Sequence, residues 1–244
     1  TIDIGESGLS ARMFTPIASL CTVPVTIIGH GSIVQRPVDM MVEPLRNLGV
    51  QVKAKKGYLP VTVRGPILGG QTKVDGSVSS QFITGLLMAL PLAKNDTTIF
   101  VSKPSSIPYL DMTMHLLSGF GIEVGHSDYR EFYVEGRQRY EPQTYNVEGD
   151  WSGASCLLVA GAIAGEVTIR NLNPRAMQAD VAIIEALSRA GAEIITTADS
   201  VTVKKRPLEG FRFDATQCPD LFPALVALAA NCHGDAVLTG TERL

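Results

Sequence analysis

Runs of basic residues and unbroken apolar stretches are both missing from this sequence. Its 21 Lys and Arg and 24 Asp and Glu residues give a net charge of −3 and are scattered, which argues against a nucleic-acid partner. The apolar stretch 83–93 is broken by Thr84, Gly85 and Pro91 and is too short to span a membrane. The N-terminal residues lack the basic start and apolar run of a signal peptide. We therefore expect a soluble, cytoplasmic protein that binds neither nucleic acid nor membrane.

Metal and disulfide signatures are also missing. The four cysteines contain no CxxC pair, and the four histidines are equally dispersed. Neither set has the spacing of a zinc site, and we interpret the cysteines as small apolar residues that stay reduced. What the chain does have is apolar material. Hydrophobic residues make up 45% and charged residues 18% of its 244 positions, which suits one large domain or two ordinary ones.

A segment of apolar helix, short turn and short β-strand recurs four times. The copies begin with Ser or Asp, which favour helix N-caps, and cover residues 10–29, 80–102, 152–171 and 220–240. A second helix follows three of the copies, and each ends at a glycine suited to a helix C-terminus, Gly49, Gly121 or Gly191. These second helices are expected at residues 38–48, 110–120 and 181–190. Two short strands follow each glycine, at residues 50–54 and 59–63, 122–124 and 132–134, and 192–196 and 200–203.

These glycines set a repeat of roughly 70 residues, which predicts an α/β (α+β) fold of pseudo-symmetric βαβαββ units. The helices at 83–90 and 156–163 are apolar nearly all round, so we expect them to be buried, with sheets and the more polar second helices outside. The polar residues 136–146 predict a connection between units. We therefore expect two domains, residues 1–147 and 148–244.

Polar residues gather at five helix starts or strand ends, where binding groups often sit in α/β proteins. The Gly-rich turn at residues 5–12 could bind an anion at a helix N-terminus or simply begin the helix. Arg36, fixed ahead of Pro37, could bind a carboxylate or phosphate, or lie free in solvent. The remaining three stretches contain Ser79-Ser80-Gln81, residues 102–109, and Asp220.

Each of these three stretches has a structural and a functional interpretation. Residues 79–81 could cap the very apolar helix 82–90 or bind a phosphate. Residues 102–109, which contain two prolines, could be a structural loop or bring hydroxyl groups to the start of the next helix. Asp220 could be a plain N-cap of a helix at 221–230 or a functional carboxylate.

The chain resembles the 5-enolpyruvylshikimate-3-phosphate synthase family at these stretches. The matching runs are DGSVSSQFITGLLMALPLA at 75–93, SIPYLDMT at 106–113, VEGDWSGAS at 147–155 and CPD at 218–220, in the family's order and spacing. The resemblance extends over essentially the whole chain, which is similar to the middle of such an enzyme without its two ends. It implies the enolpyruvyl transferase fold, with a substrate-binding domain that lacks its first unit and an incomplete second domain.

The resemblance also implies a reaction, which is transfer of the enolpyruvyl group from phosphoenolpyruvate to the 5-hydroxyl of shikimate 3-phosphate with release of phosphate. It implies no metal and no cofactor, and we expect a monomer whose partners are these two small molecules. The residues that would hold shikimate 3-phosphate are Ser79, Ser80, Gln81, Ser106 and Tyr109. Gly8, Arg36 and Gln81 would hold phosphoenolpyruvate. Asp220 would be the catalytic acid–base carboxylate.

The sequence departs from the family pattern in several places. Glu6 and Leu9 stand where the family usually has Asn and Thr. A carboxylate close to a trianionic ligand is unfavourable unless it is paired or turned away, so Glu6 is given no binding role. Ser106 is preferred to the nearby Ser102 because it keeps the family's Ser-x-Pro-Tyr spacing. The family's Gly-Ser-Lys-Ser motif and Lys-Glu-Ser-Asp-Arg segment do not occur, and without their cations we expect the chain alone to be inactive.

Two other functions stay open at this point. A sister enzyme, the enolpyruvyl transferase that acts on UDP-N-acetylglucosamine, shares the fold, although the residues at 79–81 and 106–109 argue against it. The second alternative is a non-catalytic scaffold that binds anions. Binding of shikimate 3-phosphate, of a nucleotide sugar, or of neither would separate the three possibilities.

Overall fold

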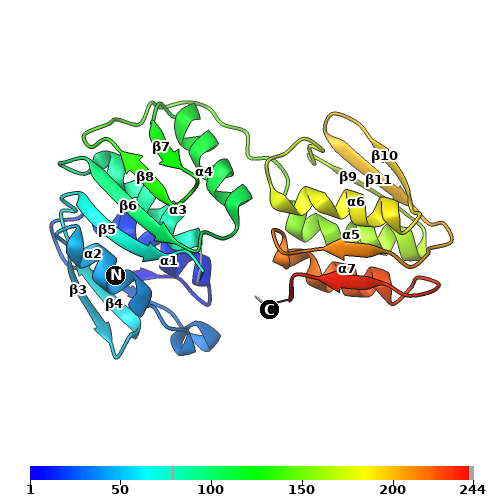
Figure 1. The fold of residues 1–244 in the computed structure, drawn as a ribbon, viewed down its shortest axis with the longest axis horizontal. Helices are drawn as coiled ribbons and strands as arrows, with labels where there is room; N and C mark the ends of the chain where they lie inside the picture. Colours follow the sequence, from blue (N-terminus) through cyan, green and yellow to red (C-terminus); the bar gives the residue numbers. More distant parts are fainter. Residues whose placement is uncertain (78–79, 242–244) are drawn as a thin grey trace. The chain divides into compact units, whose positions relative to one another are not determined.

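The computed structural model describes residues 1–77 and 80–241, which form two compact units, Thr1–Gln143 and Thr144–Leu244 (Figure 1). Each unit has its own core of buried apolar side chains, drawn from Ile4 to Val134 in the first and from Trp151 to Leu228 in the second. The division of the chain into functional domains at residues 147 and 148 stays a prediction.

Unit 1 begins with a four-stranded sheet in the order β1-β2-β4-β3. β1 is parallel to β2, and the other two pairs are antiparallel. The elements of this half are β1 (Ile2–Asp3), α1 (Gly8–Ala18), β2 (Val25–Ile28), the 3-10 turns η1 (Gly31–Gln35) and η2 (Asp39–Met41), α2 (Val42–Asn47), β3 (Gln51–Lys55) and β4 (Tyr58–Arg64).

The second half of unit 1 repeats this topology. Its sheet has the order β5-β6-β8-β7, with β5 parallel to β6 and the other pairs antiparallel. The elements are β5 (Gly70–Asp75), α3 (Ser80–Ala89), the 3-10 turn η3 (Leu90–Leu92), β6 (Thr97–Ser102), α4 (Ile107–Gly119), β7 (Val124–Ser127) and β8 (Glu131–Val134). The predicted βαβαββ repeat is therefore confirmed.

Unit 2 carries most of one further repeat and the beginning of another. Its antiparallel sheet has the order β10-β11-β9, and a parallel pair, β12 and β13, follows. The elements are α5 (Trp151–Ala164), β9 (Glu166–Arg170), the 3-10 turn η4 (Ala179–Ala182), α6 (Ile183–Arg189), β10 (Glu193–Thr196), β11 (Ser200–Lys204), β12 (Arg212–Asp214), the 3-10 turn η5 (Pro219–Leu221), α7 (Phe222–Ala229) and β13 (Val237–Thr239).

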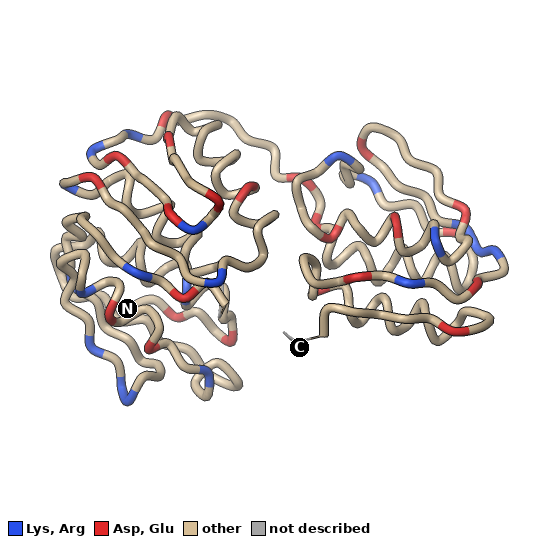
Figure 2. Tube along the Cα trace, viewed as in Figure 1, with Lys and Arg blue, Asp and Glu red and all other residues tan. Residues whose placement is uncertain are grey.

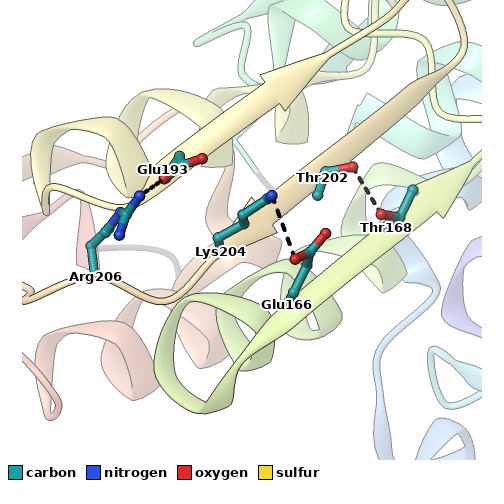
Figure 3. A network of polar contacts seen from close by, with 6 residues as sticks. All are labelled: Glu166, Thr168, Glu193, Thr202, Lys204 and Arg206. Carbon is teal, nitrogen blue, oxygen red and sulfur yellow. Dashed lines mark hydrogen bonds and ion pairs between the residues drawn. The ribbon is translucent and has the colours of Figure 1, made fainter.

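Side chains repeat as well as strands. The hydroxyl groups of Thr26 and Thr62 lie 2.9 Å apart across β2 and β4, and those of Thr168 and Thr202 lie 2.8 Å apart across β9 and β11 (Figure 3). On the same sheet of unit 2, Lys204 Nζ lies 3.5 Å from Glu166 Oε2. Cross-strand pairs of this kind hold the register of neighbouring strands.

The three predicted helix-ending glycines close their helices in the same way. Gly49, Gly121 and Gly191 have φ angles of +87°, +78° and +89°, the left-handed region that glycine enters without steric cost. In each case the N–H group of the next residue donates to a carbonyl five residues earlier, at 2.9 to 3.0 Å. The N–H group of the glycine itself donates to the carbonyl three residues earlier. This is the Schellman arrangement, and it confirms these helix ends.

The helix starts differ from the predictions. Ser7 and Asp150 are the N-caps of α1 and α5, and not the predicted Ser10 and Ser152. The Asp150 side chain accepts from the backbone N–H groups of Ser152 and Gly153, so this carboxylate, two positions before Ser152, takes the place of the predicted cap. The predicted helices at 38–48 and 181–190 begin as the 3-10 turns η2 and η4.

The first strand of each repeat was not predicted from the sequence. β5 carries only two buried side chains, Thr72 and Val74, and β1 and β12 span two and three residues. Such short strands give too little alternation to be recognised. Their pairing with a neighbouring parallel strand defines them instead.

The two helices predicted to be buried differ in the structure. In α3 seven of ten residues are buried, so that prediction is confirmed. α5 buries Trp151 and Leu158 but exposes Cys156 and Leu157, the latter to 56%. Burial all round is therefore wrong for α5, because within the described part of unit 2 the sheet and α7 cover only one side of it.

Residues 135–150, which include the predicted connection, contain neither helix nor strand. The first part of this segment is held against unit 1, because the Tyr140 hydroxyl donates a hydrogen bond to the Met88 carbonyl at 2.7 Å. Burial raises the pKa of the Tyr140 phenol to about 12.

Among the described residues, no helix is both long and apolar enough to cross a membrane. Lys and Arg residues are interspersed with Asp and Glu residues in both units (Figure 2).

Candidate active site

Two pairs of parallel strands in unit 1 deliver the candidate residues. β1 and β2 end together, with Asp3 opposite Ile28, and β5 and β6 end together, with Asp75 opposite Ser102. The turns into α1, α3 and α4 follow these carboxyl ends directly. The carboxyl ends of parallel strands are where α/β folds commonly place ligand-binding groups.

The start of α1 exposes its backbone between two arginines. Ser7 caps the helix by accepting from the Ser10 N–H group at 3.1 Å, and Gly8 is the first helical residue. Arg12 lies one turn later, and side chains on a helix lean toward its N-terminus. A Cβ atom on Gly8 would lie 3.4 Å from Arg12 Nη1 and 3.6 Å from Arg36 Nη1. Two guanidinium groups therefore lie beside Gly8, and a larger side chain at this position would contact both of them.

Arg36 is presented by the segment that follows η1. It is exposed and has an extended backbone, with φ −91° and ψ 132°. The Glu6 carboxylate holds this segment against the start of α1, because its Oε2 accepts from the Ser32 N–H group at 2.9 Å. The His30 N–H group also donates to the Gly5 carbonyl at 3.0 Å. Glu6 is thus engaged by backbone and fastens the loop that carries Arg36.

Gln81, in the first turn of α3, meets α1 at Arg12. Arg12 Nη1 donates to Gln81 Oε1 at 3.0 Å. Four residues along the same face of α3, Gly85 lets the helices approach closely, since a Cβ atom there would lie 2.9 Å from the Arg12 carbonyl oxygen. Burial of the half-buried Arg12, together with the positive charge of Arg36, lowers the pKa of the Arg12 guanidinium. The pKa is lowered mainly by burial of the guanidinium group and then by the nearby positive charge of Arg36.

Ser80 begins α3 and is 5% exposed, whereas the predicted Ser79 lies outside the described residues. The preceding turn is closed by Asp75, whose Oδ1 accepts from the backbone N–H and the hydroxyl of Ser77 at 2.9 and 2.7 Å. These hydrogen bonds, together with the nearby Lys103, lower the pKa of the Asp75 carboxyl. The Asp75 carboxylate thereby stabilises the turn that follows β5.

Ser106 and Tyr109 begin α4 beside α3. Ser106 is 6% exposed and has a left-handed backbone with φ +51°, an uncommon conformation for a residue other than glycine. The adjacent Ser105 hydroxyl donates to the Gly76 carbonyl, which ties this loop to the turn before α3.

A second contact joins α3 and α4 one turn after the start of α4. The Thr113 hydroxyl donates to the Tyr109 carbonyl at 2.7 Å and lies 3.0 Å from the Thr84 hydroxyl of α3. The segments that carry Ser80, Gln81, Ser106 and Tyr109 are therefore fastened together. Ser102, by contrast, is exposed and ends β6. The choice of Ser106 over Ser102 as a ligand stays a prediction.

Asp220 belongs to unit 2 and is exposed within η5. It does not cap α7, which begins at Phe222, so the interpretation of Asp220 as a plain N-cap is wrong. A 3-10 turn comes before the α-helix because Pro219 favours a helical start at its own position. Asp220 follows the turn after β12, as Gly8 follows β1 and Ser80 follows β5.

The neighbouring Cys218 is buried and unsuited to act as a nucleophile. Burial first, and then the carboxylates of Asp180, Asp214, Glu185 and Asp220, raise the pKa of the Cys218 thiol to about 12. A thiol in such surroundings stays protonated and unreactive. Within the described ranges, no cluster of three His, Cys, Asp or Glu side chains could hold a metal ion.

Sequence reasoning missed two residues that organise this site. Arg12 ends the Gly-rich motif at residues 5–12, and its spacing of four from Gly8 is the signal that could have revealed it, because side chains four apart share a helix face. The pairing of Glu6 with Ser32 had no local signal. It depends on how η1 packs against α1.

A family model and curated relatives that match this chain carry the same enzyme name. The family model described as EPSP synthase (3-phosphoshikimate 1-carboxyvinyltransferase) matches residues 1–244. The 3-phosphoshikimate 1-carboxyvinyltransferase of Clostridium novyi (strain NT) is 38% identical over 245 residues, which cover 100% of this chain and 56% of that protein. The protein of the same name from Methanoculleus marisnigri is 36% identical, with 100% and 59% covered.

A solved structure agrees with these sequences. The EPSP synthase from Acinetobacter baumannii superposes with a TM-score of 0.77 at 27% identity, over 100% of this chain and 58% of that one. The present chain therefore spans less than two thirds of the length of the relatives it matches.

Proposed function

Because this chain belongs to the EPSP synthase family, we propose that its residues serve the transfer of an enolpyruvyl group from phosphoenolpyruvate to the 5-hydroxyl of shikimate 3-phosphate. The observation that supports the proposal most directly is the arrangement at the starts of α1 and α3. The Arg12 and Arg36 guanidinium groups lie beside Gly8, and Arg12 donates a hydrogen bond to Gln81. Two guanidinium groups beside an open helix N-terminus suit a ligand with several negative charges. No cofactor is part of the proposal.

Shikimate 3-phosphate is assigned to the starts of α3 and α4. Hydroxyl groups and an amide suit its phosphate and ring hydroxyls, and they come from Ser79, Ser80, Gln81, Ser106 and Tyr109. Ser80 and Ser106 are both nearly buried, so hydrogen bonds that they make to a ligand are shielded from water and strengthened.

Phosphoenolpyruvate is assigned to Gly8, Arg36 and Gln81. The guanidinium of Arg36 can form paired hydrogen bonds to a carboxylate or phosphate, while the N–H groups at the start of α1 add positive potential. The Gln81 amide, which faces α1 from α3, lies where both ligands are assigned. A side chain at Gly8 would fill the space next to Arg36.

The acid–base role is assigned to Asp220. The 5-hydroxyl oxygen attacks the substituted vinyl carbon of phosphoenolpyruvate as its proton passes to the carboxylate, and the methylene carbon gains a proton to give a tetrahedral intermediate. Loss of phosphate, with loss of one proton from the resulting methyl group, restores the double bond. A carboxylate can accept the hydroxyl proton as a general base, and the carboxylic acid so formed can donate a proton to the methylene carbon as a general acid.

Calorimetric titration of the chain with shikimate 3-phosphate tests the substrate assignment. We expect binding, and we expect Ser80→Ala to weaken it about tenfold, because a shielded hydrogen bond to a charged group is lost. Ser200→Ala is a matched control that should leave the affinity unchanged, because Ser200 is a partly buried serine on β11 of unit 2 with no assigned ligand role. Binding heat with UDP-N-acetylglucosamine but not with shikimate 3-phosphate would overturn the substrate assignment. Absence of binding heat with both compounds would favour a non-catalytic scaffold.

Turnover is a separate measurement. We expect the 244 residues to release no phosphate from the two substrates, because the sequence contains no Gly-Ser-Lys-Ser motif to supply a lysine at the ligands. Phosphate release by the chain alone would contradict that expectation. The monomeric state and the cytoplasmic location stay predictions, to be checked by sedimentation and by cell fractionation.

A further inference from the structure

The hydrogen bond between Arg12 and Gln81 fixes which way the Gln81 amide points. A guanidinium group can only donate, so the amide atom 3.0 Å from Arg12 Nη1 is the oxygen. The amide nitrogen, with its two N–H groups, is therefore on the opposite branch of the side chain.

The packing of α1 on α3 supports this orientation from behind. Arg12 is held between its own helix and α3, because the backbone of residues 12 and 13 lies against Gly85. Gln81 stands one turn before Gly85, on the same face of α3. The contact thus joins two rigid elements that are 69 residues apart in the sequence. The close approach of the two helices at Gly85 keeps the backbone of Arg12 near Gln81.

From this geometry we infer that Arg12 is a positioning residue for the proposed reaction, which orients the Gln81 amide so that its N–H groups, and not its oxygen, face the anionic ligands. The inference rests on the proposed function, because Gln81 is its assigned ligand contact. Arg12 acts through Gln81, whereas Arg36, on the other side of Gly8, acts on the ligand directly.

A purely electrostatic role for Arg12 makes a different prediction. If Arg12 mattered only as a second cation, its removal would weaken anion binding whether or not Gln81 is present. If it acts by orienting Gln81, its removal should matter only while the amide is there. The two roles therefore separate in a double-mutant cycle.

The experiment uses the whole chain and four variants: Arg12→Met, Gln81→Met, the double variant, and Arg46→Met as the control. Arg46 is a matched control because it also donates a hydrogen bond, from Nη2 to the Val52 carbonyl at 3.0 Å, but lies on α2. We expect Arg12→Met to weaken shikimate 3-phosphate binding about tenfold and to have almost no further effect in the Gln81→Met background. Equal losses in both backgrounds would overturn the inference.

A second measurement needs no ligand and so separates this inference from the proposed function. The side-chain amide resonances of Gln81, followed by NMR in the free chain, should move and lose their distinct environments in Arg12→Met but stay in place in Arg46→Met. Unchanged Gln81 resonances in Arg12→Met would overturn the positioning role even if shikimate 3-phosphate does not bind. Changed resonances together with no binding to the parent chain would refute the proposed function and leave the orientation of Gln81 by Arg12 supported.

Discussion

Glu6 places a negative charge one residue from the cap of α1, close to where the proposed ligands bring phosphate groups. Its carboxylate is engaged, however, with the Ser32 N–H group at the start of η1. The left-handed Gly31 leaves room for this contact, because a Cβ atom there would lie 2.1 Å from Glu6 Oε2. A residue that would oppose the ligands as a free charge thus stabilises the segment carrying Arg36.

This role predicts different effects for two substitutions of Glu6. Glu6→Ala should lower the free energy of unfolding by about 1 kcal/mol, as the loss of an N-terminal cap does. Glu6→Gln retains an oxygen acceptor and should lower it less. Urea unfolding measures both. An equal loss in the two variants would contradict the proposed hydrogen bond.

Cys218 predicts a pattern of thiol reactivity. Because the pKa of the Cys218 thiol is raised to about 12, its thiolate is scarce at neutral and mildly alkaline pH, whereas an ordinary thiol has a pKa of about 8.5. Alkylation with iodoacetamide at a pH of about 8.5 should therefore modify the exposed Cys21 and Cys156 and spare Cys218. Mass spectrometry of peptides gives the readout, and urea-unfolded chain is the control, in which Cys218 should react. Alkylation of Cys218 as fast as Cys156 in folded protein would refute its protection.

At the scale of elements, the repeat reuses one strand-to-helix turn. β1, β5 and β12 each end in an aspartate, and each carboxylate accepts the backbone N–H group two residues later. These aspartates are Asp3, Asp75 and Asp214. The turn directs the chain from the strand into the helix start, which is where Gly8, Ser80 and Asp220 stand. The assigned residues Gly8, Ser80 and Asp220 therefore occupy equivalent places in the repeats that begin with β1, β5 and β12.

The close approach of α1 and α3 at Gly85 predicts that alanine destabilises the protein at this position but not at a glycine with open space around it. Gly85→Ala would force a methyl group to 2.9 Å from backbone atoms of Arg12 and Met13. We expect a loss of about 1–3 kcal/mol in the free energy of unfolding, more than the gain of about 1 kcal/mol in helix propensity.

Gly119→Ala, at the end of α4, is the matched control for this change. The nearest atom to its added methyl group is Gln143 Nε2 at 3.6 Å, an ordinary contact with a flexible side chain. It should leave stability within about 1 kcal/mol of the parent. Equal stability of the two variants in urea would show that the helices can move apart freely.

At the scale of the whole molecule, each unit contains its own core, and one natural probe distinguishes them. Trp151 is the single tryptophan and is fully buried in unit 2. Leu225→Ala, in unit 2, should move the urea midpoint followed by tryptophan fluorescence, because deleting a buried leucine costs about 2–5 kcal/mol. Leu45→Ala, in unit 1, should move the transition followed by circular dichroism and leave the fluorescence midpoint in place. A shift of the fluorescence midpoint in both variants would mean that the units unfold together.

The sequence by itself determined the repeat and most of its elements. The glycines at 49, 121 and 191 and the apolar helices are local signals, since backbone conformation and burial periodicity depend on residues within a few positions of one another. The resemblance to the family came from four motifs in order and spacing, at residues 75–93, 106–113, 147–155 and 218–220. The caps at Ser7 and Asp150 were missed because several hydroxyl and carboxylate side chains compete over one turn.

The tertiary structure alone decided how the candidate residues are arranged. Arg12 meets Gln81 across 69 positions, and Glu6 meets Ser32 across 26. The exposed face of α5 was likewise beyond prediction, because an apolar pattern does not say which neighbours cover it. Contacts between distant segments depend on how strands pair and helices pack, and no periodicity within one element records that choice.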